Sequence, residues 1–141
     1  MAASVLRISL LNNVDELCRL TSAIDQFGKE QGLSKEDVFR LNLVLEEIVT
    51  NVISYAFDDD LAHEIEVTVE SGEELVVTVE DDGIAFDPLA RQPSFQSDSI
   101  ENTKVGGWGL YLVRSNSKKV SYSRQGKKNR LQATLAIEGD T

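Results

Sequence analysis

The longest regular pattern in this sequence is a run of apolar residues at helical spacing between residues 35 and 57. Its apolar positions recur mostly three or four residues apart, at Leu41, Val44, Leu45, Ile48, Val52 and Tyr55. Ser34 stands before the run and Asp37 follows three residues later, which resembles a capping box at a helix start. The run therefore predicts a long helix with one apolar face.

Shorter periodic segments lie on both sides of this run. Alternating strand patterns occupy residues 5–11, 63–70, 74–80, 120–124 and 130–137. Further helical patterns occupy residues 14–31, ahead of Gly32, and about 107–118. The order βααββαββ predicts an α+β fold, a two-layer sandwich with helices on one face of a mixed or antiparallel sheet.

Length and composition predict one globular domain over residues 1–141. Hydrophobic residues make up 41% of the chain and charged residues 27%, which is the balance of a chain with a core. No apolar run reaches the roughly 18 residues of a membrane helix, and the N-terminus lacks a basic and then apolar signal sequence. We therefore expect a soluble cytoplasmic protein that does not enter a membrane.

The net charge of −10 argues against nucleic acid as a direct partner, because phosphate recognition needs clustered Lys and Arg. The one basic cluster, Lys127, Lys128 and Arg130, stands in a predicted hairpin turn, where such charges usually serve only solvation. The acidic remainder suits a protein partner with a basic face, which is a property of many partners.

Glu47 and Asn51 stand four residues apart within the long helical run. At about 100° per residue, their side chains project within roughly 40° of each other. A carboxylate can orient or deprotonate a nucleophile, and an amide oxygen one turn away can ligate Mg²⁺. Polar residues at the border of a buried helix give the same pattern, so the pair alone does not establish a site.

Asp81 and Gly83 follow the strand pattern of residues 74–80. A carboxylate at a strand end can accept a hydrogen bond from the amino group of adenine, and it repels the oxygen that guanine presents there. Gly83 lets the backbone approach a base or sugar closely. An ordinary turn also favours Asp and Gly, which is the alternative for this segment taken alone.

Gly106, Gly107 and Gly109 stand just before an apolar run that begins at Leu110. Exposed N–H groups at a helix start bind phosphate oxygens, and glycine lets the backbone come close to them. A glycine cluster also marks flexible hinges, so the order of these motifs matters more than this one alone.

In that order, the motifs resemble those of the GHKL, or Bergerat-fold, ATP-binding domains, most closely the small bacterial anti-sigma-factor serine kinases. Residues 47–51 (Glu-Ile-Val-Thr-Asn) are similar to the N box of that family, residues 81–85 (Asp-Asp-Gly-Ile-Ala) to its G1 box and residues 106–110 (Gly-Gly-Trp-Gly-Leu) to its G2 box. Residues 119–131 resemble its closing hairpin, so the resemblance extends over about residues 4–137.

The resemblance implies a nucleotide site with ATP and Mg²⁺ as cofactors. Glu47 corresponds to the catalytic base, Asn51 to the Mg²⁺ ligand and Asp81 to the residue that reads adenine. The other positions that correspond to the nucleotide site are Gly83, Ala85, Gly106, Gly107, Gly109 and Leu110.

Residues 86–105 lose periodicity and are rich in Ser, Asp, Gln and Asn. So long an irregular segment is usually functional or disordered, and the resemblance implies that it is the lid over the nucleotide. Arg91 and Lys104 are its basic residues, and each is a candidate for contact with the γ-phosphate or for surface solvation alone.

Ala85 departs from the family pattern, which usually has a second glycine at this position. If the backbone there requires a positive φ, alanine costs on the order of 1–2 kcal/mol. If φ is negative, the change is almost free.

The activity that the resemblance implies is that of an ATP-dependent serine/threonine protein kinase that also acts as an anti-sigma factor. Such a protein phosphorylates an antagonist of the STAS type and sequesters a sigma factor, and proteins of this kind often form homodimers. The alternative is a non-catalytic, nucleotide-gated protein-binding module of the same fold. A sensor histidine-kinase fragment is less favoured, because the only histidine, His63, starts a strand pattern. A scaffold that binds no nucleotide has Ala85 as its only specific support.

Overall fold

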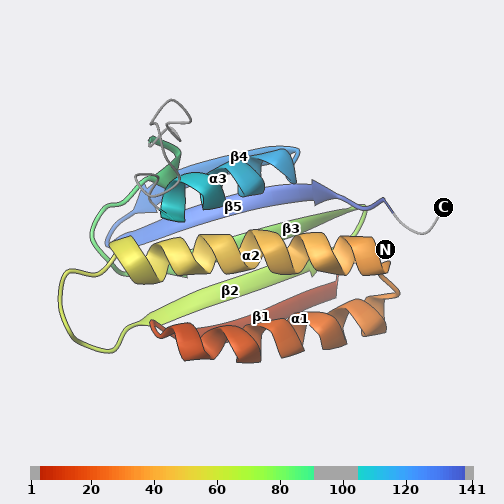
Figure 1. Ribbon diagram of the computed structural model, residues 1–141, viewed down its shortest axis with the longest axis horizontal. Helices are drawn as coiled ribbons and strands as arrows, with labels where there is room; N and C mark the ends of the chain where they lie inside the picture. The colour runs from red at the N-terminus through yellow and green to blue at the C-terminus, as the bar shows by residue number, and fades with distance from the viewer. Residues whose placement is uncertain (1–3, 91–104, 139–141) are drawn as a thin grey trace.

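A sheet and a layer of helices over one of its faces make up the structure (Figure 1). The computed structural model describes residues 4–90 and 105–138. Its strands are β1 (Ser4–Leu11), β2 (Glu64–Ser71), β3 (Glu74–Asp81), β4 (Lys119–Gln125) and β5 (Lys128–Ala136). Its helices are α1 (Leu17–Gln31), α2 (Lys35–Tyr55) and α3 (Val105–Ser115), with the short 3-10 helices η1 (Val14–Glu16) and η2 (Pro88–Ala90).

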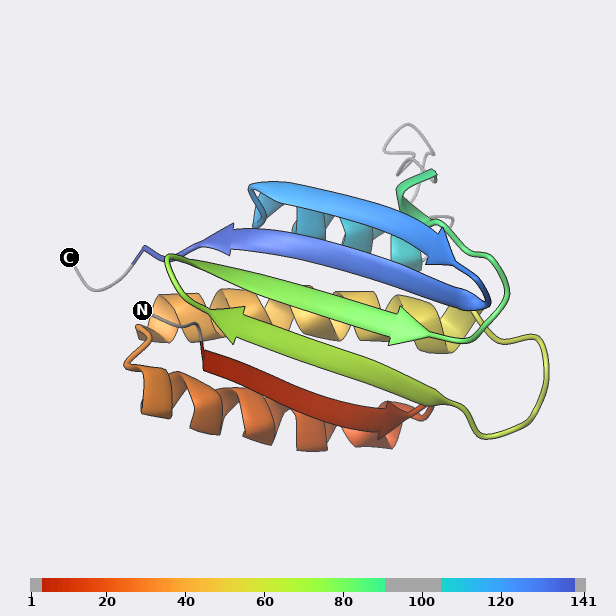
Figure 2. The same cartoon turned by 180° about the vertical axis from the view of Figure 1, so that it is seen from behind.

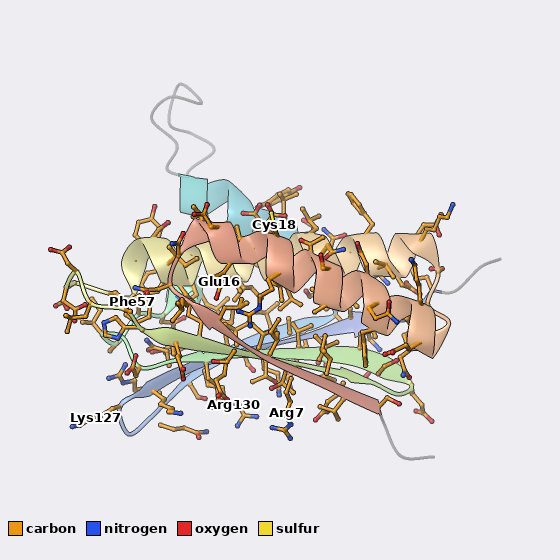
Figure 3. All side chains as sticks on the ribbon, turned by 90° about the horizontal axis from the view of Figure 1, so that it is seen from below. Arg7, Glu16, Cys18, Phe57, Lys127 and Arg130 are labelled. Atoms are coloured by element: carbon orange, nitrogen blue, oxygen red, sulfur yellow. The ribbon has the colours of Figure 1, made fainter. Side chains whose placement is uncertain are left out.

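The five strands pair in the order β1-β2-β3-β5-β4, and every pair is antiparallel. The helices lie on one side of this sheet, and its other face is uncovered (Figure 2). Arg7 and Arg130 project from that uncovered face (Figure 3). The predicted α+β class with helices on one face is therefore confirmed, and of the two sheet types left open, the antiparallel one is present.

Helix α2 supplies the centre of the core. Its apolar positions pack against alternate residues of the central strands, because successive residues of a strand point to opposite faces. The buried residues of α2 include Leu41, Val44, Leu45, Ile48, Val49 and Val52. Their partners from β2, β3 and β5 include Ile65, Val67, Val69, Leu75, Val77, Val79, Leu131, Ala133 and Leu135. Burial of each large apolar side chain contributes about 1.5–3 kcal/mol, so α2 is held firmly along the sheet.

Each of the three predicted helices differs from the structure at one boundary or more, and the helical run over residues 35–57 ends at Tyr55. The segment predicted as one helix over residues 14–31 is the 3-10 helix η1 followed by α1, which ends at Gly32 with a φ of 68°. Helix α3 runs over Val105–Ser115, whereas residues 107–118 were predicted. Gly106 therefore lies inside the helix instead of before it, and Gly107 and Gly109 lie inside it as the predicted range implies. Because glycine is a poor helix former, local propensity places the start of α3 too late. Burial of Leu110 and Val113 outweighs this low propensity.

The start of α2 is capped as predicted, and it carries a buried ion pair. The N–H of Asp37 donates to Oγ of Ser34 at 3.1 Å. Nη2 of Arg40 lies 2.7 Å from Oδ1 of Asp37, whose side chain is fully buried. The same guanidinium donates to the carbonyl of Ala136 in β5 and, at 3.5 Å, to that of Asn116 after α3. The pair therefore ties α2 to the ends of β5 and α3.

Replacement of Arg40 by Met is expected to lower the free energy of unfolding by about 3–5 kcal/mol, because the buried carboxylate of Asp37 then loses its ion pair with the guanidinium. Urea denaturation followed by circular dichroism measures this. The double variant Asp37→Leu with Arg40→Met removes both charges and should recover most of the loss. A loss of under about 1 kcal/mol in the single variant would contradict a stabilising role for the pair.

Helix length and polarity also bear on membrane insertion. Within residues 4–90 and 105–138, none of the helices has the length and apolar character needed to cross a bilayer.

Candidate functional site

A cavity lies where the C-terminal half of α2 meets the ends of β3 and β5. It is narrow, with about 20 Å³ of space that water can enter. Its lining is Ile48, Asn51, Val52, Val79, Asp81, Phe86, Pro88, Leu110, Val113, Tyr122, Asn129 and Leu131. A mostly apolar cavity with a few convergent polar groups is the usual form of a small-molecule site.

Asp81 is the last residue of β3, and only 4% of it is exposed. Its Oδ1 accepts hydrogen bonds from the N–H of Gly83 at 2.8 Å and from Nδ2 of Asn129 at 2.9 Å. Burial raises the pKa of this carboxyl, and the two hydrogen bonds act in the opposite direction. The cavity therefore holds a buried acceptor that suits a hydrogen-bond donor on a planar base.

Asn129 is the polar centre of the site, and it is not among the residues predicted from the sequence. It is 4% exposed, and its Nδ2 also donates to the carbonyl of Ile84 at 2.7 Å. Its Oδ1 accepts from the hydroxyl of Tyr122. It also accepts from Nη1 of Arg124 and from the N–H of Phe86, both at 3.2 Å. Asn129 stands among basic residues in the sequence, and such a cluster is usually interpreted as an exposed turn. Its alternation with Leu131, Ala133 and Leu135 is the signal that could have placed it on the buried face.

Hydrogen bonds from several elements fix the segment that follows β3, residues 83–86. Nη1 of Arg124 donates to the carbonyl of Gly83 at 2.8 Å. The N–H of Ile84 donates to the carbonyl of Ala56, which follows α2, also at 2.8 Å. Together with Asn129, these contacts fix residues 83–86 against α2, β4 and β5. The backbone beside Asp81 is therefore arranged before any ligand arrives.

Gly83 has a structural role besides the predicted approach to a base or sugar, which stays a prediction. It is buried but does not line the cavity. A Cβ at this position would lie 2.2 Å from the carbonyl oxygen of Ala56. Gly83 is therefore required by the close approach of two backbone segments, and it acts on the cavity through the position of Asp81.

Ala85 is exposed, and within the described ranges no residue other than glycine has a positive φ. Of the two cases left open for Ala85, the negative φ is the one observed. The departure from glycine therefore carries no backbone strain, and it offers no support for loss of nucleotide binding.

Asn51 and Asp81 are brought together in the same cavity, from α2 and β3. Asn51 is 7% exposed. Glu47 lies one turn earlier on α2, half-buried, and does not belong to the cavity lining. Burial, and then repulsion from the exposed Glu46, raise the pKa of Glu47. The pair predicted to face one site therefore has one member in the cavity wall and one beside it.

The predicted G2-box and lid residues are placed in part. Leu110 is buried and lines the cavity. The backbone of Gly106, Gly107 and Gly109 belongs to the first turns of α3. Phe86 and Pro88, at the start of the predicted lid, also line the cavity. Arg91 and Lys104 lie outside the described residues.

The donor set of the cavity fits Mg²⁺ bound together with a nucleotide. Mg²⁺ takes one or two protein oxygens and completes its shell with phosphates and water. The amide oxygen of the largely buried Asn51 meets that need. In residues 4–90 and 105–138, no three His, Cys, Asp or Glu side chains gather as a metal site of their own.

Helices on one face of an antiparallel sheet, with a buried carboxylate in a cavity at one end of the central strand β3, define a Bergerat-type α+β domain. Solved structures share this fold. The RsbU and RsbW domains of a Mycobacterium tuberculosis protein match 95% of this chain and 32% of theirs, with a TM-score of 0.69 and 14% identity. The histidine kinase AdeS of Acinetobacter baumannii matches 94% of this chain and 68% of its own, with a TM-score of 0.51 and 18% identity.

The sequence matches the model of the histidine kinase-like ATPase domain over residues 10–135, and the chain belongs to that family. The serine/threonine-protein kinase BtrW of Bordetella bronchiseptica is 30% identical over 97 residues, which are 68% of each chain. The serine-protein kinase RsbW of Bacillus velezensis is 29% identical over 104 residues, 70% of this chain and 64% of the relative. The RsbW of Listeria innocua is 32% identical over 98 residues, 66% of this chain and 62% of the relative. The chain thus spans slightly less than two thirds of these two RsbW proteins.

Proposed function

We propose that this protein is an ATP-dependent serine/threonine protein kinase that acts as an anti-sigma factor. Its substrate is a serine or threonine of a STAS-type antagonist, and its second partner is a sigma factor. The observation that carries the proposal is the buried carboxylate of Asp81 in the same cavity as Asn51. Relatives named as serine or serine/threonine kinases support the reaction class.

The residues of the site have separate tasks in this proposal. Asp81 accepts a hydrogen bond from the amino group of adenine, and the apolar lining holds the base. Asn51 holds Mg²⁺, which offsets charge on the phosphates when it is bound. Glu47 accepts or orients the proton of the substrate hydroxyl, and its raised pKa brings it closer to neutral pH than an ordinary glutamate.

The partners follow from the resemblance of the motifs to those of anti-sigma-factor kinases and from net charge. A chain with a net charge of −10 favours association with a basic protein surface. Nucleic acid has no part in the proposal. A homodimer is part of it, because the proteins that the motifs resemble often form one, and sedimentation velocity measures the mass.

Calorimetric titration of ATP with Mg²⁺ into the wild-type protein tests the first half of the proposal, and saturable binding is expected. The second half is tested with γ-labelled ATP and purified STAS proteins from the same genome, one of which should gain label on serine or threonine. Binding without transfer to any of them would favour the nucleotide-gated binding module. If ATP titration gives no heat and ADP does not compete for the site, both the kinase and the nucleotide-gated module are contradicted. A protein-binding scaffold would then remain.

A further inference from the structure

Within the described part of the chain, hydrogen bonds reach one of the two oxygens of the Asp81 carboxylate. Its Oδ1 accepts two hydrogen bonds, from the N–H of Gly83 at 2.8 Å and from Nδ2 of Asn129 at 2.9 Å. Among residues 4–90 and 105–138, no hydrogen bond reaches Oδ2. The two oxygens of one buried carboxylate therefore have different environments, and a ligand in the cavity meets a single available acceptor.

The orientation of the Asn129 amide is determined by its other partners. Its Oδ1 accepts from three donors, the hydroxyl of Tyr122, Nη1 of Arg124 and the N–H of Phe86. A flipped amide would place its NH₂ group against these donors and its oxygen against the Asp81 carboxylate and the Ile84 carbonyl. The contacts with Arg124, Phe86, Asp81 and Ile84 would all become unfavourable, and only the hydroxyl of Tyr122, which can also accept, would tolerate the flip. Asn129 therefore donates to Asp81 in one fixed direction.

The number of free oxygens on such a carboxylate decides which purine it recognises. A carboxylate with two free oxygens accepts two parallel N–H donors at once. Guanine presents that pair, its ring N1–H beside its exocyclic amino group. Adenine presents one amino group beside an unprotonated ring nitrogen. A single free oxygen therefore matches adenine and gives no advantage to guanine.

We propose that Asn129 is a positioning residue that determines base specificity, because it takes up, together with the N–H of Gly83, both acceptor positions of Asp81 Oδ1 and leaves only Oδ2 for the base. This inference rests on the proposed nucleotide binding. It concerns a residue that acts through Asp81, in a network contributed by β3, β4 and β5. Arg124 supports the arrangement from its contacts with Asn129 and with the carbonyl of Gly83.

The first test compares the affinities for ATP and GTP, each with Mg²⁺, in three proteins. Wild type should prefer ATP by at least about tenfold, the factor given by one hydrogen bond to a charged group. In Asn129→Ala that preference should shrink by about tenfold. Gln132→Ala is the matched control, because Gln132 Nε2 also donates from β5 to β3, to Thr78 Oγ1 at 3.1 Å, outside the cavity. Its preference should equal that of wild type.

The second test needs no nucleotide and separates positioning from packing. Titration of the Asp81 carboxyl by NMR should show a pKa about one to two units higher in Asn129→Ala than in wild type, because the donor stabilises the ionised form. Gln132→Ala should leave this pKa unchanged. If Asn129→Ala does not fold, Asn129→Asp is used, since it keeps the acceptor for Tyr122 and Arg124 and removes the donor to Asp81. It should shift selectivity and pKa in the same direction.

The outcomes are distinct. An unchanged pKa of Asp81 in a folded Asn129 variant overturns the inference whether or not nucleotide binds. A raised pKa with an unchanged preference for ATP overturns the specificity role. A raised pKa in a protein whose wild type binds neither nucleotide overturns the proposed function and base specificity, while Asn129 keeps its role in positioning Asp81. A raised pKa with a reduced preference supports the inference.

Discussion

Replacement of Glu47 by Gln is expected to lower the rate of phosphoryl transfer by about 10²–10⁴-fold, the usual contribution of a general base. Glutamine keeps the size of the side chain but accepts no proton. Because Glu47 does not line the cavity, ATP affinity should stay near the wild-type value. Single-turnover transfer of γ-labelled phosphate to the antagonist measures the rate, and calorimetry measures the affinity.

The pH profile gives a second signature of Glu47. Burial, and then the charge of Glu46, raise the pKa of Glu47. The active, ionised form is therefore present above that raised pKa and is lost as the pH falls through it. Transfer by the wild type should decline on this acidic side, and the decline should be absent from the residual activity of Glu47→Gln.

Glu46→Gln is the matched control, since Glu46 is exposed on the neighbouring position of α2. It should keep the transfer rate at neutral pH. Its acidic decline should move to lower pH, because removal of the Glu46 charge lowers the pKa of Glu47. Equal loss of activity in both variants would contradict the assignment of the base to Glu47.

Replacement of Asp81 by Asn is expected to weaken ATP binding by at least about a hundredfold. The hydrogen bond from adenine to a charged group is lost, and the NH₂ group of the new side chain faces the amino group of adenine, donor against donor. The oxygen of the new amide stays with the donors of Gly83 and Asn129. Its NH₂ group therefore takes the place of Oδ2 and faces the amino group of adenine. Calorimetric titration of ATP with Mg²⁺ measures the loss.

The same geometry predicts a relative gain for guanine. Its exocyclic oxygen lies where adenine has the amino group, so the NH₂ of Asp81→Asn can donate to it. The affinity ratio of GTP to ATP should therefore rise. The fold should be retained, because both hydrogen bonds to the Oδ1 position persist and a buried charge is removed.

Asp82→Asn is the control for this variant. Asp82 is the exposed neighbour of Asp81, its Oδ1 lies 3.2 Å from Nδ1 of His63, and it does not line the cavity. It should leave ATP affinity unchanged. If Asp81→Asn binds ATP as tightly as wild type does, adenine is not read by this carboxylate.

Much of the fold was readable from the sequence because burial of one face imposes a period on the residues. The spacing of Leu41, Leu45, Ile48 and Val52 predicted α2, and alternation predicted the strands to within one or two residues. The start of α3 was missed because Gly106 and Gly107 lower helix propensity, whereas packing of Leu110 and Val113 holds the helix.

Sequence motifs pointed to those residues of the cavity that stand within a motif. They did not point to residues whose place depends on contacts between distant segments. Asn51 and Asp81 both line one cavity, and their roles in nucleotide binding stay predictions. The structural role of Gly83 was not predicted, because the atom that excludes a side chain there is the carbonyl oxygen of Ala56, which follows α2. Asn129 was passed over within a basic cluster, because its burial depends on the pairing of β5 with β3.

The sequence by itself determined the helices and strands, their order and the family motifs, because periodicity, capping and motif spacing are local properties of the chain. Only the tertiary structure decided the strand order, the backbone angle at Ala85 and the hydrogen bonds of Asp81. These depend on atoms from α2, β3, β4 and β5 that meet only when the sheet has formed. The number of free oxygens that Asp81 offers to a base is therefore a property of the fold.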